Sequence, residues 1–126
     1  MKNTREIGSK YEELVTKYAI KCGYKIIEKN YRTRFSEIDI IIKDNDIIAF
    51  VEVKYRKSNS SNNAIYSVSK AKQKRISSCA LSYISSKKLS LNNKFRFDVV
   101  AIDGKEFKWI KNAFDFYEGY SVWVNL

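Results

Sequence analysis

The chain has 126 residues, and its 24 lysines and arginines against 14 acids give a formal charge of +10. The absence of histidine excludes Ser-His-Asp and Cys-His catalysis and zinc sites that use imidazole. No apolar run approaches the length of about 18 residues that a membrane helix needs, and the charged N-terminal stretch lacks the apolar centre of a secretory signal. We therefore expect one soluble, cytoplasmic domain that covers residues 1–126.

The excess of positive charge predicts a polyanionic partner, because clustered cations release counterions when they meet phosphate groups. Nucleic acid is the expected partner, and a solvated basic surface is the alternative. Without histidine, any chemistry must use carboxylates, amines, guanidinium groups or hydroxyls together with a divalent metal ion.

The N-terminal part predicts a helix over residues 3–22, followed by Gly23 as a helix terminator and a short strand at 24–32. The helix has an apolar stripe at helical spacing, made of Ile7, Tyr11, Leu14, Val15, Tyr18, Ala19 and Cys22. Glu13 is expected to pair with Lys17 on the outer face. The two cysteines, Cys22 and Cys79, both lie on apolar helix stripes, which favours the core over a disulfide or metal site.

The central and C-terminal parts predict two strands, a loop, a second helix and two more strands. In chain order these are the strand Glu37–Ile42, the turn "KDND", the strand Ile47–Lys54, a mobile polar loop at 56–64, a helix at 69–86, a strand at Phe95–Ile102 and a strand around Phe107–Ile110. The second helix should turn Ile76, Cys79, Ala80, Tyr83 and Ile84 inward. Helices that flank strands with two apolar faces predict an α/β fold, a mixed sheet covered on both sides.

The hairpin "EIDIIIKDNDIIAFVEVK" carries polar residues inside the most hydrophobic part of the chain. Side chains alternate along a strand, so Glu37 and Asp39 share one face, as do Glu52 and Lys54. If Asp39 lies opposite Glu52, all four polar groups converge. The other face is then wholly apolar, formed by Ile38, Ile40, Ile42, Ala49, Val51 and Val53. Burial selects this register, because a slip by one residue would mix carboxylates with aliphatic side chains.

Converging carboxylates repel one another unless a cation lies nearby. Lys54 offsets one charge, and the remainder suits Mg²⁺ or Mn²⁺, which prefer oxygen ligands and can activate water against a phosphodiester. The alternative is a structural one, in which Glu37 pairs with Lys54 and Asp39 simply ends a strand.

The motif formed by Asp39 and Glu52-Val53-Lys54 resembles the signature of the PD-(D/E)xK nuclease superfamily, which has the restriction-endonuclease-like fold. More closely, the chain resembles the YraN-like (UPF0102) family of predicted endonucleases related to archaeal Holliday junction resolvases. The resemblance runs from about residue 3 to residue 114. Its landmarks are "GSKYEE", "CGYKIIEKNYR", "SEIDIII", "FVEVKYR", "VSKAKQKRI" and "FRFDVVAIDG".

The resemblance implies metal binding by Asp39 and Glu52 with the Val53 carbonyl, and a catalytic role for Lys54. Glu37 would belong to the same catalytic group, and Glu12 would approach it as an outer acid. From the sequence pattern alone, Glu12 either borders the apolar stripe or is solvated. Tyr11 and Ser36 depart from the family pattern, which has glycine at both positions.

Three basic residues match positions that the family resemblance associates with phosphate contacts: Arg56, Lys72 and Arg75. A solvated helix face is the alternative for Lys72 and Arg75. Arg96 and Asp98 also match the family, and a structural ion pair explains them equally well. The expected function is Mg²⁺- or Mn²⁺-dependent hydrolysis of DNA, with branched or junction DNA as a candidate substrate. A non-catalytic nucleic-acid-binding protein and a basic scaffold for another protein are the alternatives, and a homodimer follows by analogy with resolvases alone.

Overall fold

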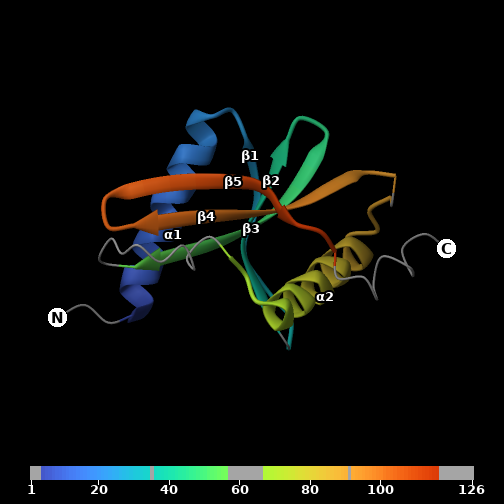
Figure 1. The fold of residues 1–126 in the computed structure, drawn as a ribbon. Coiled ribbons are helices and arrows are strands. Elements are labelled where there is room, and N and C mark those ends of the chain that lie inside the picture. Colours follow the sequence, from blue (N-terminus) through green and yellow to red (C-terminus); the bar gives the residue numbers. More distant parts are fainter. Residues whose placement is uncertain (1–3, 35, 57–66, 91, 117–126) are drawn as a thin grey trace.

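The computed structural model describes residues 4–34, 36–56, 67–90 and 92–116. It contains one sheet of five strands and two helices (Figure 1). The elements are α1 (Thr4–Lys21), β1 (Lys25–Arg32), β2 (Glu37–Asp44), β3 (Ile47–Arg56), α2 (Lys70–Ser86), β4 (Lys94–Asp103) and β5 (Glu106–Phe114). Almost all of the predicted loop at 56–64 and the C-terminal residues 117–126 lie outside the described residues. Within the described part of the chain, neither helix is both long and apolar enough to cross a membrane.

The sheet has the strand order β1-β2-β3-β4-β5, so each strand lies beside its neighbour in sequence. All pairs are antiparallel except β3 with β4, which run parallel and are joined by a crossover through α2. A parallel pair needs such a long connection, whereas tight hairpins join β2 to β3 and β4 to β5. The predicted mixed sheet and the predicted order of elements are confirmed.

Each helix covers one face of the sheet (Figure 1). On one face, Val15 and Ala19 of α1 pack on an aliphatic cluster that includes Ile40, Ile42 and Val51. On the other face, α2 packs on the central strands through its buried residues, which include all those predicted to point inward: Ile76, Cys79, Ala80, Tyr83 and Ile84. The predicted two-sided coverage is therefore confirmed.

The predicted apolar stripe of α1 is only partly buried. Val15 and Ala19 are fully buried, whereas Leu14 and Tyr18 expose 47% and 43% of their surface. Cys22 is exposed, so its assignment to the core was wrong, while Cys79 is buried as predicted. The reason is that α1 ends at Lys21 and Gly23 adopts a positive φ of 89°, which carries Cys22 past the last turn that faces the sheet.

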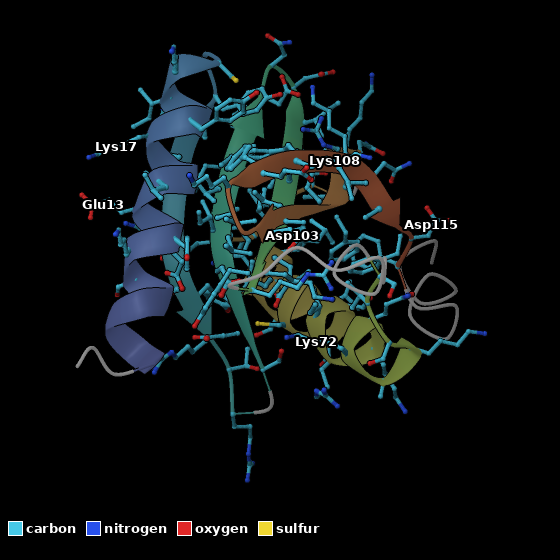
Figure 2. All side chains as sticks on the ribbon, turned by 60° about the vertical axis from the view of Figure 1, so that its left-hand side comes forward. Glu13, Lys17, Lys72, Asp103, Lys108 and Asp115 are labelled. Carbon is cyan, nitrogen blue, oxygen red and sulfur yellow. The ribbon has the colours of Figure 1, made fainter. Side chains whose placement is uncertain are left out.

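The outer face of α1 carries the predicted pair of Glu13 and Lys17, whose charged atoms are 3.8 Å apart. Both side chains point away from the sheet (Figure 2). At the other helix, Ser69 caps the N-terminus of α2 and its side chain accepts a hydrogen bond from the Lys72 amide. This cap fixes the start of α2 directly above the end of the β2–β3 hairpin that carries the acids, where Lys72 meets Glu52.

Candidate active site

The β2–β3 hairpin has the register predicted from burial. Ile40 lies opposite Val51, Ile42 opposite Ala49 and Asp44 opposite Ile47. The same register would place Asp39 opposite Glu52. The paired part of the two strands ends at Ile40 and Val51, directly before these two acids. The acids therefore lie where β2 and β3 begin to separate.

Where the pairing of β2 with β3 ends, a side chain of β2 accepts a hydrogen bond from the backbone of β3. The Val53 amide donates a hydrogen bond to Oδ2 of Asp39 at 2.7 Å. Ile38, which was predicted to share a face with Ile40 and Ile42, instead packs in the cluster under α2, while Ile40 packs under α1. The prediction of one wholly apolar face was wrong at Ile38. Beyond Ile40, β2 is no longer paired with β3 and keeps only its pairing with β1, where Ile38 lies opposite Tyr31, a residue that packs against the same cluster under α2.

Asp39 and Glu52 are both buried, with 8% and 9% of their surface exposed. Burial raises the pKa of Asp39 to about 8, and the charge of Glu52 is the next cause of the shift. The hydrogen bond from the Val53 amide opposes the shift, and the charges of Glu12 and Glu37 add to it. Four acids from α1, β2 and β3 thus act on one another at this point. The charge of Glu52 acts on Asp39 more strongly than that of either other acid.

Glu12 of α1 lies close enough to Asp39 and Glu52 for their charges to interact. The sequence had left open whether Glu12 borders the apolar stripe or is solvated. It is half-buried, and burial raises its pKa. A side-chain hydrogen bond with Asn30 lowers the pKa, whereas the charges of Glu37 and Glu52 raise it. The outer acid implied by the family resemblance is therefore brought close to the acids of the hairpin.

Two lysines lie on the α2 side of the site. Lys72, in the first turn of α2, places Nζ 2.9 Å from Oε1 of Glu52. The Lys54 ammonium donates to the carbonyl of Ser67, just before α2. Burial lowers the pKa of Lys54, the charge of Lys72 lowers it further, and the charge of Glu52 opposes both. The site thus combines four acids with two nearby amines.

Glu37, the remaining acid of the hairpin, is bound by a residue of the neighbouring strand β1. Nε of Arg32 on β1 donates to Oε2 of Glu37 at 2.7 Å. Glu37 and Lys54, which the hairpin register would set opposite each other, therefore have partners on other elements. This arrangement does not support the structural alternative in which these two residues form the pair that explains the motif.

The predicted phosphate-binding residues differ in their surroundings. Arg56 makes two hydrogen bonds to Asp103 at the end of β4, at 2.9 and 2.7 Å. Arg75 is exposed on α2. Lys72, labelled in Figure 2, is half-exposed and pairs with Glu52. All three lie at the end of the sheet where β3 and β4 finish or on the helix beside it, and contact with phosphate remains a prediction for each.

Arg96 and Asp98 form a structural ion pair inside the fold. Nε of Arg96 lies 2.9 Å from Oδ1 of Asp98, and Nη1 lies 2.8 Å from Oδ2 of Asp44. Asp98 also accepts from the Trp109 indole at 2.9 Å and from the Asn112 amide at 3.0 Å. These contacts tie β4 to β5 and to the end of β2, so they account for both residues without a role in the site.

The acids offer the oxygen donors that Mg²⁺ and Mn²⁺ prefer. In the described part of the chain, however, no three acid or cysteine side chains lie close enough to hold a metal ion as they stand. Mg²⁺ commonly keeps several waters and binds one or two carboxylates. The buried, mutually repelling pair of Asp39 and Glu52 fits that smaller requirement, because a cation would relieve the repulsion between them.

Comparison with known sequences decides the family. The profile of the Uncharacterised protein family UPF0102 matches residues 11–102, which include every acid of the site. The chain belongs to the UPF0102 family. The UPF0102 protein FN1370 of Fusobacterium nucleatum is 46% identical over 110 residues, which cover 87% of this chain and 92% of the relative.

Two further UPF0102 relatives show the same extent of similarity. THEYE_A1950 of Thermodesulfovibrio yellowstonii is 45% identical over 109 residues, which cover 86% of this chain and 96% of the relative. VP0448 of Vibrio parahaemolyticus is 38% identical over 111 residues, which cover 86% of this chain and 92% of the relative. The family match at residues 11–102 includes most of α1, all of α2 and the strands β1 to β3 of this UPF0102 protein.

Sequence reasoning missed the contacts that hold the acids in place. Lys72 was expected to meet phosphate, yet it pairs with Glu52, and neither Arg32 nor Asn30 was assigned to the site. Arg32 could have been found, because it lies five residues before Glu37 on a strand predicted to precede β2. No signal predicts the contact of Lys72, because it depends on how α2 crosses over the sheet.

Proposed function

We propose that this UPF0102 protein is a divalent-metal-dependent endonuclease that hydrolyses phosphodiester bonds of DNA, with branched and junction DNA among its substrates. One observation carries the proposal. Asp39 and Glu52 are both buried just beyond the paired part of the hairpin, and burial together with the charge of Glu52 raises the pKa of Asp39 to about 8. Buried negative charge would weaken a surface that only binds polyanions. In a nuclease that depends on a metal ion, the same charge binds the cation.

The residues that would hold the ion are the carboxylates of Asp39 and Glu52, with the carbonyl of Val53. A bound Mg²⁺ or Mn²⁺ supplies Lewis-acid polarisation of the phosphate and a lower pKa for its bound water. The ion would also favour the charged form of Asp39, against the burial that now raises its pKa. To bind the ion, Asp39 would have to give up part of its contact with the Val53 amide, and Glu52 part of its contact with Lys72.

Lys54 supplies the amine of the site. Its ammonium lies on the same strand as Glu52, two residues further on, and its side chain turns to the same α2 side of the sheet. There it can orient a water molecule and stabilise negative charge that develops on the phosphate oxygens. Its lowered pKa brings it closer to neutral pH, which makes exchange of a proton easier than for a solvated lysine.

Glu12 and Glu37 surround the pair from the α1 and β1 sides. Their charges keep the site negative and so favour a divalent cation over a monovalent one. Glu37 is held in place by Arg32, and Glu12 by Asn30. We assign both residues to orientation of the ion's water ligands.

A second candidate, a DNA-binding protein without catalysis, is supported by a different observation. Each acid of the pair already has a partner in the protein, since Asp39 accepts from the Val53 amide and Glu52 pairs with Lys72. Such contacts would stabilise the fold without any metal ion. Under this hypothesis the basic charge of +10 would account for binding, and the acids would be structural.

One assay separates the two candidates. The purified protein is incubated with linear, flapped and four-way-junction DNA in Mg²⁺, Mn²⁺ or EDTA. We expect cleavage that requires the metal ion and is lost in Asp39→Asn and Glu52→Gln, which preserve shape and remove charge. Asp46→Asn, at an exposed acid in the β2–β3 turn, is the matched control and should cleave normally. Equal binding by all variants without cleavage would support the binding protein.

A further inference from the structure

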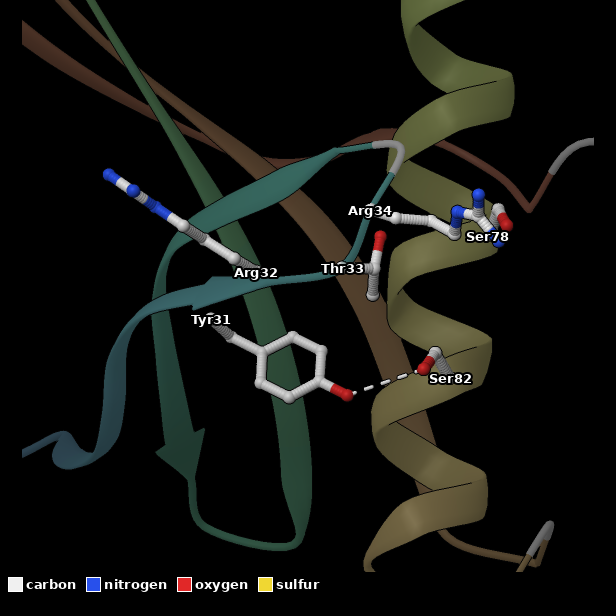
Figure 3. Close-up of a pocket in the computed structure, with 6 residues that line it drawn as sticks. All are labelled: Tyr31, Arg32, Thr33, Arg34, Ser78 and Ser82. Carbon is white, nitrogen blue, oxygen red and sulfur yellow. Dashed lines mark hydrogen bonds between the residues drawn. The ribbon is translucent and has the colours of Figure 1, made fainter.

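A pocket of about 440 Å³ lies between the turn that joins β1 to β2 and the face of α2. Its lining residues are Tyr31, Arg32, Thr33, Arg34, Ser78 and Ser82 (Figure 3). Apart from the contact of Arg32 with Glu37, these residues have no part in the site described above. The pocket is open to solvent, where Arg34 and Ser82 are exposed, and every residue that lines it carries a hydroxyl or a guanidinium group.

The chemistry of the lining favours an anion with several oxygen atoms. Four of the six side chains carry hydroxyls, two carry guanidinium groups, and none is acidic. Arg34 extends across the pocket toward Ser78, whereas Arg32 extends the other way (Figure 3). A guanidinium group donates hydrogen bonds in a planar fork that matches phosphate oxygens, and serine and threonine hydroxyls donate to the same oxygens.

Contacts between β1, the β1–β2 turn and α2 fix the walls of the pocket. Tyr31 and Ser82 hydrogen-bond through their hydroxyls at 3.3 Å, and the Tyr31 ring meets Tyr83 edge-on at 5.1 Å. The Cys79 thiol lies 3.9 and 3.7 Å from the carbonyls of Tyr31 and Ser36, so it anchors both ends of the turn to α2. A site whose walls are already ordered loses less entropy when a ligand binds.

The pocket is connected to the acids by two routes. Through β1, Arg32 at the edge of the pocket pairs with Glu37 of the acid group. Through α2, Arg75, Ser78 and Ser82 follow one another at helical spacing on one face. Lys72 beside Glu52 lies six residues before Ser78, which corresponds to about 9 Å along the helix axis. Basic and hydroxyl side chains therefore continue along α2 from the acid site to the pocket.

We propose that this pocket binds a backbone phosphate of the same DNA strand whose scissile phosphodiester lies at Asp39 and Glu52. The inference rests on the proposed function and adds a second point of attachment, which fixes the direction in which the strand crosses α2. Arg34 and Ser78 are the residues that contact this phosphate, and Arg75 lies between the two points of attachment.

The test measures DNA affinity in EDTA, so that cleavage has no influence on the result. Anisotropy of a labelled duplex is recorded at several salt concentrations for the wild type, Arg34→Gln, Ser78→Glu and Lys25→Gln. Lys25 is an exposed residue at the far end of β1, so its variant loses the same charge away from the pocket. Thermal unfolding of each variant checks that the fold is retained.

We expect Arg34→Gln to weaken binding by about tenfold, since one charge-assisted contact is lost. Its plot of log affinity against log salt concentration should become shallower by about 0.9, the value for one phosphate contact. Ser78→Glu should weaken binding more, because it places a negative charge in the pocket, and Lys25→Gln should match the wild type.

Two outcomes would overturn the inference and leave the proposed function standing. In the first, the wild type binds DNA and both pocket variants bind as Lys25→Gln does, with an unchanged salt dependence. In the second, Arg34→Gln weakens binding of a nucleoside monophosphate but not of DNA, which would identify a pocket for small phosphates. Failure of the wild type to bind any DNA would instead overturn the proposed function, and this inference with it.

Discussion

Glu52 and Lys72 form an ion pair across the contact of β3 with α2, with 2.9 Å between Oε1 and Nζ. The Glu52 side chain is 11% exposed and the Lys72 side chain 46%. The pair joins a proposed metal ligand to a residue expected to contact phosphate. A cation that binds Glu52 must therefore compete with the Lys72 ammonium, which would then be released toward the DNA.

Replacement of this lysine should strengthen metal binding. In Lys72→Met, Glu52 loses a competing positive charge that contributes about 1 kcal/mol, so Mn²⁺ should bind about fivefold more tightly. Calorimetric titration of the DNA-free protein measures the change, with Lys25→Met as the control for a general loss of positive charge. Unchanged or weaker Mn²⁺ binding would show that Lys72 does not compete for Glu52.

The raised pKa of Asp39 predicts how stability depends on pH in the absence of metal. In the folded protein the pKa is about 8, above the value of about 4 in the unfolded chain, so folding favours the protonated carboxyl. This contribution to the free energy of unfolding is fully present below about pH 4. It is lost progressively as the pH rises from about 4 to about 8. Glu12, whose pKa is also raised by burial, acts in the same direction.

Comparison with Asp39→Asn isolates this effect, because asparagine keeps an oxygen that can accept from the Val53 amide. Urea unfolding in EDTA should show that the variant gains stability relative to the wild type between about pH 4 and pH 8, with no further gain above. The chain has no histidine to obscure this range. A difference that stays constant with pH would mean that Asp39 has an ordinary pKa.

The buried network around Arg96 should matter for stability. The Arg96 side chain is 10% exposed and its guanidinium group contacts two carboxylates, those of Asp98 and Asp44. Asp98→Ala removes one of them and should lower the free energy of unfolding by about 3–5 kcal/mol. Asp46→Ala removes a carboxylate whose side chain is 71% exposed, and should cost about 0.5 kcal/mol or less. Urea unfolding of both variants compares the two ion pairs directly, and similar costs would contradict the structural role of Asp98.

The two cysteines should differ in reactivity. Cys22 is exposed, whereas Cys79 is buried and burial raises the pKa of its thiol. In the native protein, Ellman's reagent should modify Cys22 rapidly and Cys79 only after denaturant is added. Cys22→Ser should remove the rapid phase. Rapid modification that persists in Cys22→Ser would show that α2 does not cover Cys79 as described.

Much of this architecture could be predicted from local pattern. The alternation of apolar residues from Ile38 to Val53 predicted the hairpin and its register, because a slip would bury carboxylates among aliphatic side chains. The helical spacing of Ile76, Cys79 and Tyr83 predicted the face of α2 that is buried. Both features depend on residues that are close in sequence.

The details of the site could not be predicted in the same way. Ile38 changes face where β2 leaves β3 and stays paired with β1 alone, and the pattern of apolar residues contains no sign of that change. Cys22 fits the apolar stripe of α1 but lies beyond the last helical turn. The contact of Lys72 with Glu52 depends on the path of the chain between β3 and α2. The misses at Ile38 and Lys72 therefore depend on tertiary structure, whereas the miss at Cys22 depends on where α1 ends.

Binding of a metal ion at Asp39 and Glu52 can be seen by diffraction from crystals soaked in Mn²⁺, recorded at a wavelength where manganese scatters anomalously. We expect one anomalous peak in contact with the carboxylates of both residues, with the Lys72 ammonium moved away from Glu52. No peak at these acids, with Asp39 still accepting from the Val53 amide and Glu52 still paired with Lys72, would show that they do not form a metal site.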